Sequence, residues 1–234
     1  VSIETIRRDL EYLEKQGLLT RVYGGAVLNQ KKGKEPLYEQ REIKHYAEKA
    51  AIAQRAVELI EDGDVLGIDI GTTAREFAKA LIGKKKVIVL TNSMPIAEIL
   101  SEDENIRVIM LGGEVRKGEF SVSGFVAEQV MSRFNLDKYI LGIGGLTVEN
   151  GITDYHIEET NLRRVMLERS QKVIGLTDYS KFGVIAMNEV CPLSRLDVLI
   201  TDSRADRMII GKMHTMKTEV IQIEAPGEQP DMEQ

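Results

Sequence analysis

The chain has very little cysteine and histidine. Cys191 is the one cysteine among 234 residues, and a lone cysteine supports neither a disulfide framework nor a cysteine zinc cluster. The three histidines, His45, His156 and His214, lie far apart and show no metal-ligand spacing. We therefore expect no metal site and no bound cofactor, and the sequence excludes the disulfide-rich and zinc-cluster classes of protein.

Long apolar runs and a basic excess are absent as well. No segment of the sequence approaches the ~18 consecutive apolar residues that span a bilayer, and no secretory signal is recognisable. We therefore expect a cytoplasmic protein without a membrane partner. The formal net charge of −6 argues against a protein coated in basic charge. It remains compatible with a small DNA-binding module on an acidic body.

What is present is the composition of a folded protein, with 43% hydrophobic and 29% charged residues. Residues 1–28 have the pattern of a helix followed by a hairpin. Ser2 suits the start of the helix and Gly17 its end, while Gly24 and Gly25 suit a turn between two short strands. A helix and a hairpin form the last half of a winged helix-turn-helix, whose helix enters the major groove of DNA.

This N-terminal segment has a second interpretation. Acidic and basic residues balance over residues 1–28, so charge does not separate a DNA-binding unit from an amphipathic helix and hairpin that pack on the main domain. One helix and one hairpin cannot bury a core alone. We therefore expect the two preceding helices of a winged domain to lie outside this chain.

A polar segment, residues 29–36, reads as a linker, and a long helical pattern follows from Leu37 to Ile60. Beyond it strands alternate with helices up to residue 225, and residues 226–234 form a polar tail. This alternation predicts an α/β domain over residues 37–225, with a mostly parallel sheet covered on both faces. The strands are expected at 65–69, 87–91, 106–111, 138–143, 172–177, 197–201 and 219–223, and the helices at 73–82, 94–101, 125–133, 157–170 and 204–211.

The first predicted strand ends in a turn that suits an anion. Gly71 allows backbone conformations that other residues resist, and Thr72 and Thr73 open the next helix. The first N–H groups of a helix lack partners and carry the positive end of its dipole, so they attract phosphate. The alternative is an ordinary strand-to-helix turn with a threonine cap.

The other predicted strands also end in small or polar residues. Ligands bind outside the carboxyl ends of parallel strands, so we expect these residues to gather around a small polyhydroxylated anion. Backbone N–H groups and Lys181 would hold phosphate, while acidic and amide side chains would bind sugar hydroxyls. The candidate effector-binding residues are Asp69, Gly71, Thr72, Thr73, Thr91, Asn92, Gly112, Gly113, Gly144, Gly145, Asp154, Glu159, Asp178 and Lys181.

Two sets of motifs resemble the DeoR family of bacterial transcriptional regulators. In residues 1–28 they are T-I-R-R-D-L, G-L-L and Y-G-G-A. The resemblance implies that Ser2, Thr5, Arg7 and Arg8 lie at or near operator DNA. In residues 37–225 they are D-I-G-T-T, T-N-S, L-G-G-E, G-I-G-G-L, N-G-I-T-D, E-E-T-N-L-R-R-V-M and T-D-Y-S-K-F-G.

The second set resembles the DeoR-type sensor domain. That resemblance implies a fold similar to ribose phosphate isomerase and CoA-transferase folds, with phosphorylated sugars as effectors. It implies a phosphate loop at D-I-G-T-T and an anion-contacting lysine at Lys181. The chain departs from the family pattern at Asp154, Tyr155 and His156, where many members have Thr-Pro-Asn, so effector identity is expected to be decided there. His156 is interpreted as an exposed residue at the start of a helix, with contact to phosphate as the alternative.

These patterns favour a repressor of sugar-metabolism genes that a sugar phosphate releases from DNA, acting as a homodimer or homotetramer and without catalysis. The runner-up is a sugar-phosphate isomerase, since aldose–ketose isomerisation needs a base and several acids are suitably placed. A bare oligomerisation scaffold is a third interpretation. The candidate bases of the isomerase are Asp69, Asp154, Glu159 and Asp178.

Overall fold

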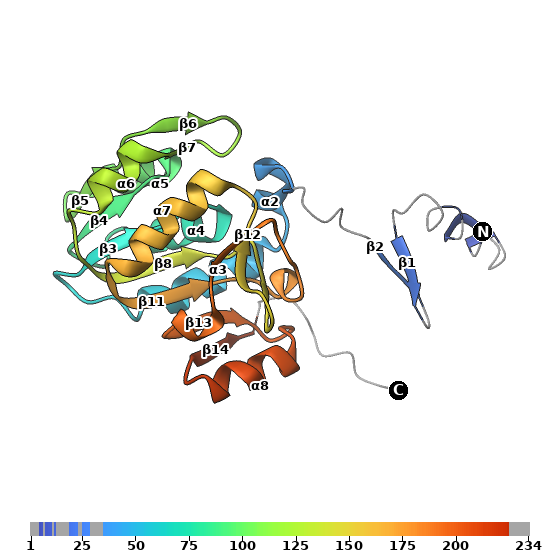
Figure 1. Cartoon of the computed structure of the whole chain (residues 1–234). Coiled ribbons are helices and arrows are strands. Elements are labelled where there is room, and N and C mark those ends of the chain that lie inside the picture. The colour runs from blue at the N-terminus through green and yellow to red at the C-terminus, as the bar shows by residue number, and fades with distance from the viewer. Residues whose placement is uncertain are drawn as a thin grey trace. The chain divides into compact units, whose positions relative to one another are not determined.

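The computed structural model describes residues 5–6, 8–10, 12, 19–22, 25–28 and 35–224. They belong to two compact units, Val1–Glu35 and Pro36–Gln234 (Figure 1). In the first unit the described residues between 5 and 12 are helical. The strands β1 (Leu19–Val22) and β2 (Gly25–Leu28) pair antiparallel. The predicted hairpin is therefore confirmed, while Gly17 and Gly24 lie outside the described residues.

The second unit is built on a seven-stranded sheet, which confirms the predicted α/β class. Every pairing within this sheet is parallel. The strand order is β14-β13-β11-β8-β3-β4-β5. The seven strands correspond to the predicted ones with small differences at their ends: β3 (Val65–Ile68), β4 (Val87–Thr91), β5 (Ile106–Met110), β8 (Leu136–Gly142), β11 (Ser170–Leu176), β13 (Val198–Asp202) and β14 (Glu219–Ile223).

Helices cover both faces of this sheet (Figure 1). Side chains alternate along each strand, so that Ile174 packs into one apolar cluster and Val173 into the other. The first cluster is closed by α3 (Tyr46–Val57), α4 (Thr72–Leu81) and α5 (Met94–Ser101). The second is closed by α6 (Phe125–Met131), α7 (Ile157–Glu168) and α8 (Arg207–Thr215).

Two helical predictions need correction. The pattern from Leu37 to Ile60 is not one helix, because His45 takes a left-handed backbone conformation with φ of 54° between α2 (Tyr38–Ile43) and α3. The helix predicted at 204–211 begins later, at Arg207. Asp206 is its cap: the side chain accepts hydrogen bonds from two backbone N–H groups of the first turn.

Short strands at the carboxyl edge of the sheet were not predicted, because three or four residues are too few to show periodicity. The strands β6 (Glu114–Arg116) and β7 (Ser121–Ser123) form a hairpin, labelled in Figure 1. A second small sheet has the order β12-β10-β9. Its members are β9 (Gly145–Thr147), β10 (Gly151–Asp154) and β12 (Asn188–Cys191), and two short 3-10 helices, η1 (Tyr179–Lys181) and η2 (Leu193–Arg195), complete the unit.

No helix in the part of the chain that the structure describes combines the length and apolarity needed to cross a membrane.

Candidate functional site

The centre of the candidate site lies where β8 and β3 end side by side. The two strands are neighbours in the sheet, so the residues that follow them meet at its carboxyl edge. The backbone N–H of Gly142 donates to Oδ2 of Asp69 over 3.1 Å. A Cβ on Gly144 would lie 2.8 Å from Oδ2 of Asp154. Asp69 therefore lies close to Gly144 and Asp154, which belong to a distant part of the sequence.

The turn after β3 has the geometry of an anion cradle. Gly71, the residue before α4, has φ of 109°, and apart from its chain neighbours no residue that the structure describes lies within 4 Å of the position that a Cβ would take. L-residues avoid this conformation, which explains the glycine. The helix begins at Thr72, so the N–H groups of its first turn have no partners within the helix. The space above Gly71 is open to an anion that would accept from them.

A buried arginine holds this turn in place. Nε of Arg163, on α7, lies 2.7 Å from Oδ2 of Asp69, and Nη1 lies 2.9 Å from Oδ2 of Asp154. Arg163 is 4% exposed, Asp69 1% and Asp154 6%. The other oxygen of Asp154 accepts from the backbone N–H of Tyr155 over 2.7 Å. One guanidinium therefore fixes the end of β3, the end of β10 and α7 relative to one another.

Asp69, Arg163 and Asp154 form a buried triad that has two carboxylates and one guanidinium. The pKa of Asp69 is raised to about 6, mainly by burial and in small part by the neighbouring Asp154, against the lowering effect of the charge and hydrogen bond of Arg163. Burial alone would lower the pKa of Arg163, but the carboxylates of Asp154 and Asp69 hold that pKa well above its usual value. Two buried carboxylates, Asp69 and Asp154, therefore share one cation.

The pKa of Asp69 predicts a pH dependence of stability. The pKa is about 6 in the folded state, above the ordinary 3.8. The folded protein therefore binds a proton at Asp69 more tightly than the unfolded chain does. The stability that this proton provides is complete below about pH 4 and is lost as the pH rises through 6. We expect the unfolding free energy of the wild type, minus that of Asp69→Asn, to fall by about 1.4 kcal/mol from pH 5 to pH 7.5. Urea denaturation at both pH values measures this difference, and a difference that is constant or rises with pH would contradict the assignment.

Glu159 ties the β6–β7 hairpin to α7. Oε1 accepts a hydrogen bond from Oγ of Ser121 over 2.6 Å, and Oε2 pairs with Nη1 of Arg116 at 2.5 Å. Glu159 is 1% exposed. The same hairpin is bound to the end of β4, because the side-chain amide of Asn92 donates to the carbonyl of Val122 over 3.1 Å. Both predicted site residues therefore have structural partners.

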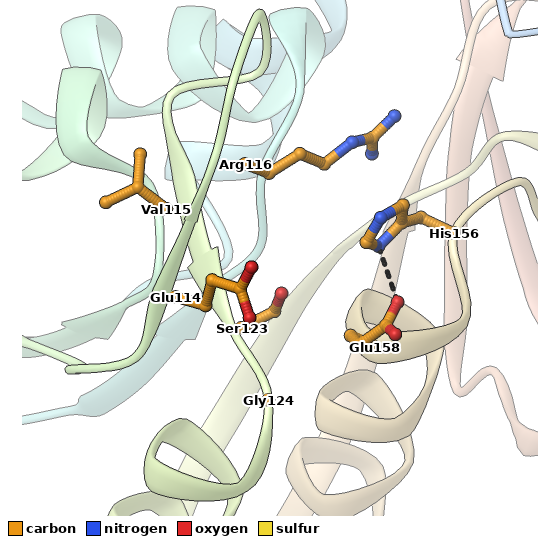
Figure 2. A pocket seen from close by; sticks show the side chains of 7 residues that line it. All are labelled: Glu114, Val115, Arg116, Ser123, Gly124, His156 and Glu158. Atoms are coloured by element: carbon orange, nitrogen blue, oxygen red, sulfur yellow. Dashed lines mark ion pairs between the residues drawn. The ribbon is translucent and has the colours of Figure 1, made fainter.

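A hollow lies between this hairpin and the start of α7 (Figure 2). Its volume is about 150 Å³, below the ~300–1,000 Å³ of sites for drug-sized ligands, so it suits a small polar group. Figure 2 shows Arg116 and Glu114 extending toward the side where His156 and Glu158 lie, whereas Val115 points to the opposite side of the hairpin. Nδ1 of His156 lies 3.2 Å from Oε2 of Glu158. The histidine is about one third exposed. The lining residues are Glu114, Val115, Arg116, Ser123, Gly124, His156 and Glu158.

The end of β11 brings two lysines toward one acid. Asp178 is 2% exposed, and its side chain accepts from the backbone N–H of Ser180 over 3.0 Å. Lys181 is half-buried in η1. The pKa of Lys49, a residue of α3, is lowered to about 8, mainly by burial; Asp178 acts to raise this pKa and Lys181 to lower it. Lys49, Lys181 and Asp178 are therefore close enough to interact electrostatically beside this strand end.

Several predicted residues have a packing explanation. Gly113 follows the edge strand β5, and a Cβ there would lie 2.4 Å from the carbonyl oxygen of Ser123. A Cβ on Gly145 would lie 2.5 Å from the carbonyl oxygen of Val184. Gly112 is exposed beside them, and Thr91 is fully buried, its Oγ1 accepting from the N–H of Ser93. Contact of these four residues with an effector stays a prediction.

Sequence reasoning missed the arginines that organise the site. Arg163 stands four residues after Glu159 and shares the buried side of α7 with Leu162 and Met166. A charged residue on an apolar helical stripe was the available signal, since such a residue is buried only with a partner. Arg116 and Ser121 gave no signal, because they lie on strands too short to be predicted.

The predicted DNA-contacting residues are partly described. Thr5 and Arg8 are helical and exposed, whereas Ser2 and Arg7 lie outside the described residues. Among the residues that the structure describes, His, Cys, Asp and Glu side chains form no group that would hold a metal ion.

Comparisons with known proteins cover both units. Residues 1–32 match the family model described as DeoR-like helix-turn-helix domain, and residues 44–203 match the one described as DeoR C terminal sensor domain. The chain is 34% identical to the HTH-type transcriptional regulator GolR of Listeria innocua over 91% of this chain and 84% of that protein. It is 36% identical to the glycerol-3-phosphate regulon repressor of Escherichia coli over 87% of this chain and 80% of that protein.

Part of the chain also resembles solved structures. Ribose 5-phosphate isomerase A of Methanocaldococcus jannaschii gives a TM-score of 0.43 at 18% identity, over 57% of this chain and 53% of that one. The eIF2B beta chain of Chaetomium thermophilum gives a TM-score of 0.45 at 16% identity, over 66% of this chain and 48% of that one. At this identity the likeness concerns the fold alone.

Proposed function

The chain belongs to the DeoR family of transcriptional regulators, and we propose that it is a cytoplasmic repressor of sugar-metabolism genes that a phosphorylated sugar releases from operator DNA. The open N-terminus of α4, set at the polar edge of the sensor unit, is the observation that carries this proposal. The helix and hairpin of the first unit supply the DNA-binding half. The name of the E. coli relative, a glycerol-3-phosphate regulon repressor, agrees with a small phosphorylated effector.

We place the phosphate of the effector at the N–H groups of Thr72 and Thr73, above Gly71, with Lys181 as the nearby cation. The dipole of α4 and the N–H groups of its first turn, which lack partners within the helix, favour an anion there. The sugar hydroxyls then face the carboxylates at the ends of β3 and β10. The hollow lined by Arg116 and His156 is small enough to select for the size of the sugar.

We propose binding without turnover. A base for isomerisation must be free to take a proton from carbon. Asp69 and Asp154 share Arg163, while Glu159 is held by Ser121 and Arg116. These carboxylates are engaged in holding the edge of the sheet together, which supports a sensor rather than a catalyst.

The regulatory effect requires two states with different affinities for DNA. An effector that binds one state better shifts the population toward it, and the coupling is reciprocal. We propose that the two states differ in the geometry of a homodimer or homotetramer, because helix-turn-helix proteins read paired half-sites through two-fold symmetry.

Thermal unfolding of the full chain with a panel of phosphorylated sugars tests the sensor half. A ligand that is present at ~100 times its Kd is expected to stabilise the protein by about 2.7 kcal/mol. The unphosphorylated parent sugars at the same concentrations are the control, and we expect no stabilisation from them. Stabilisation by none of the phosphorylated sugars would contradict the proposed function.

A further inference from the structure

Helix α2 rests on the helix whose N-terminus forms the candidate phosphate site. Glu42 of α2 forms an ion pair with Nη1 of Arg75, in the first turns of α4. The hydroxyl of Tyr38, also on α2, hydrogen-bonds to Arg75. In the sequence α2 begins two positions after residues 29–36, the predicted linker between the DNA-binding unit and the sensor unit. Arg75 therefore connects the candidate effector site with the segment that leads to the DNA-binding residues.

Two further loops of the candidate site contact the same segment. Arg41 of α2 pairs with Glu119, in the turn of the β6–β7 hairpin. The ring of His45, at the break between α2 and α3, lies 5.0 Å from that of Tyr179 in η1, edge to face. Nζ of the buried Lys49 donates to the backbone carbonyls of Arg41 and Lys44, the latter over 2.6 Å. The position of α2 thus depends on the loops that surround the proposed effector.

Arg75 is placed to reach an anion at the start of its helix. Its backbone N–H donates to the carbonyl of Gly71 over 3.0 Å, so the two residues are one turn apart. Helical side chains lean toward the N-terminus and cover the preceding turn. Nε of Arg75 is buried and makes no hydrogen bond with any residue that the structure describes. The guanidinium therefore has a donor without a partner among the described residues, on a side chain one helical turn after Gly71.

We propose that Arg75 exchanges Glu42 for the phosphate of the effector, and that this exchange releases α2 from α4. The inference rests on the proposed function and names the residue through which effector binding reaches the linker. Glu42 is 40% exposed and Arg75 26%, so their ion pair is screened by water and readily broken. A phosphate offers more negative charge than a carboxylate and accepts from a guanidinium at two points.

If Glu42 and phosphate compete for Arg75, two variants of the full chain should change the phosphate affinity in opposite directions. Inorganic phosphate, titrated by calorimetry, is the probe. Glu42→Gln removes the competitor, and we expect it to bind phosphate two- to fivefold more tightly than the wild type. Arg75→Gln removes the cation, and we expect it to bind at least fivefold more weakly. The matched controls are Glu58→Gln and Arg55→Gln, which break a pair on α3 with the same residue types at 2.8 Å and should leave the affinity unchanged.

Hydrogen exchange of the backbone amides of residues 38–43 reports on α2 itself. In the wild type we expect phosphate to speed this exchange, whereas in Glu42→Gln the exchange should be fast already without phosphate. Equal phosphate affinity in the wild type and Glu42→Gln would overturn the inference, as would exchange that phosphate does not change. If either of those two results is found and the wild type still binds phosphorylated sugars, the proposed function stands and only the role of Arg75 fails. If it binds no phosphorylated sugar and no phosphate, both fail.

Discussion

Replacing Arg163 with methionine is expected to lower the free energy of unfolding by about 3–5 kcal/mol at neutral pH. Methionine keeps much of the side-chain volume but leaves Asp69 and Asp154 buried without a cation. A buried charge that loses its partner retains the full cost of its desolvation. Urea denaturation of the full chain, followed by circular dichroism, measures the loss.

Arg55→Met is the matched control for this substitution. Arg55 pairs with Glu58 on the surface of α3, where Glu58 is 66% exposed, so a change within about 1 kcal/mol is expected. Adding Asp69→Asn and Asp154→Asn to Arg163→Met removes the uncompensated charges and should restore part of the stability. A loss below about 1 kcal/mol for Arg163→Met would show that the triad does not hold the site together.

Replacing Thr72 with valine is expected to weaken binding of a phosphorylated sugar by about 10- to 150-fold without changing the fold. The substitution keeps the branched shape at the first residue of α4 and removes the hydroxyl. We expect this hydroxyl to donate a hydrogen bond to the phosphate. A hydrogen bond to a charged group contributes about 1.5–3 kcal/mol, which corresponds to the expected 10- to 150-fold loss of affinity. Titration calorimetry measures the affinity, and circular dichroism checks the fold.

Thr215→Val is the control for Thr72→Val. Thr215 also lies in a helix, and its hydroxyl donates to the carbonyl of Lys212 on the exposed side of α8. Its loss should change stability slightly and effector affinity not at all. Unchanged affinity in Thr72→Val would mean that the phosphate binds away from the start of α4.

Local patterns in the sequence were enough to predict the seven long strands and most of the helices between them. Buried parallel strands such as Val87–Thr91 read as short apolar runs, and helices such as Met94–Ser101 begin at a serine cap followed by proline. These signals depend on neighbouring residues only. The polar turn at Gly71 was visible for the same reason, because a glycine before two threonines determines a local conformation. The family motifs added the DNA-binding unit and the sensor function.

Residues that pair across the fold could not be identified from the sequence. Asp69 and Arg163 are separated by 94 positions in the sequence, and Glu42 and Arg75 by 33. Gly113 and Gly145 were predicted to contact an effector, but only the structure showed the backbone that packs against each of them. The short strands of the β6–β7 hairpin, which bring Arg116 to Glu159, have no periodicity to detect.

The sequence by itself determined the succession of the long strands along the chain, the glycine turn that we propose to bind an anion and the membership in a family of regulators, because each depends on residues that are close together along the chain. The tertiary structure alone decided which carboxylate is buried with which arginine. Burial and ion pairing depend on the order of the strands in the sheet and on the helices that cross it. For that reason the role of Arg163, and the contact of α2 with Arg75, emerged only from the folded chain.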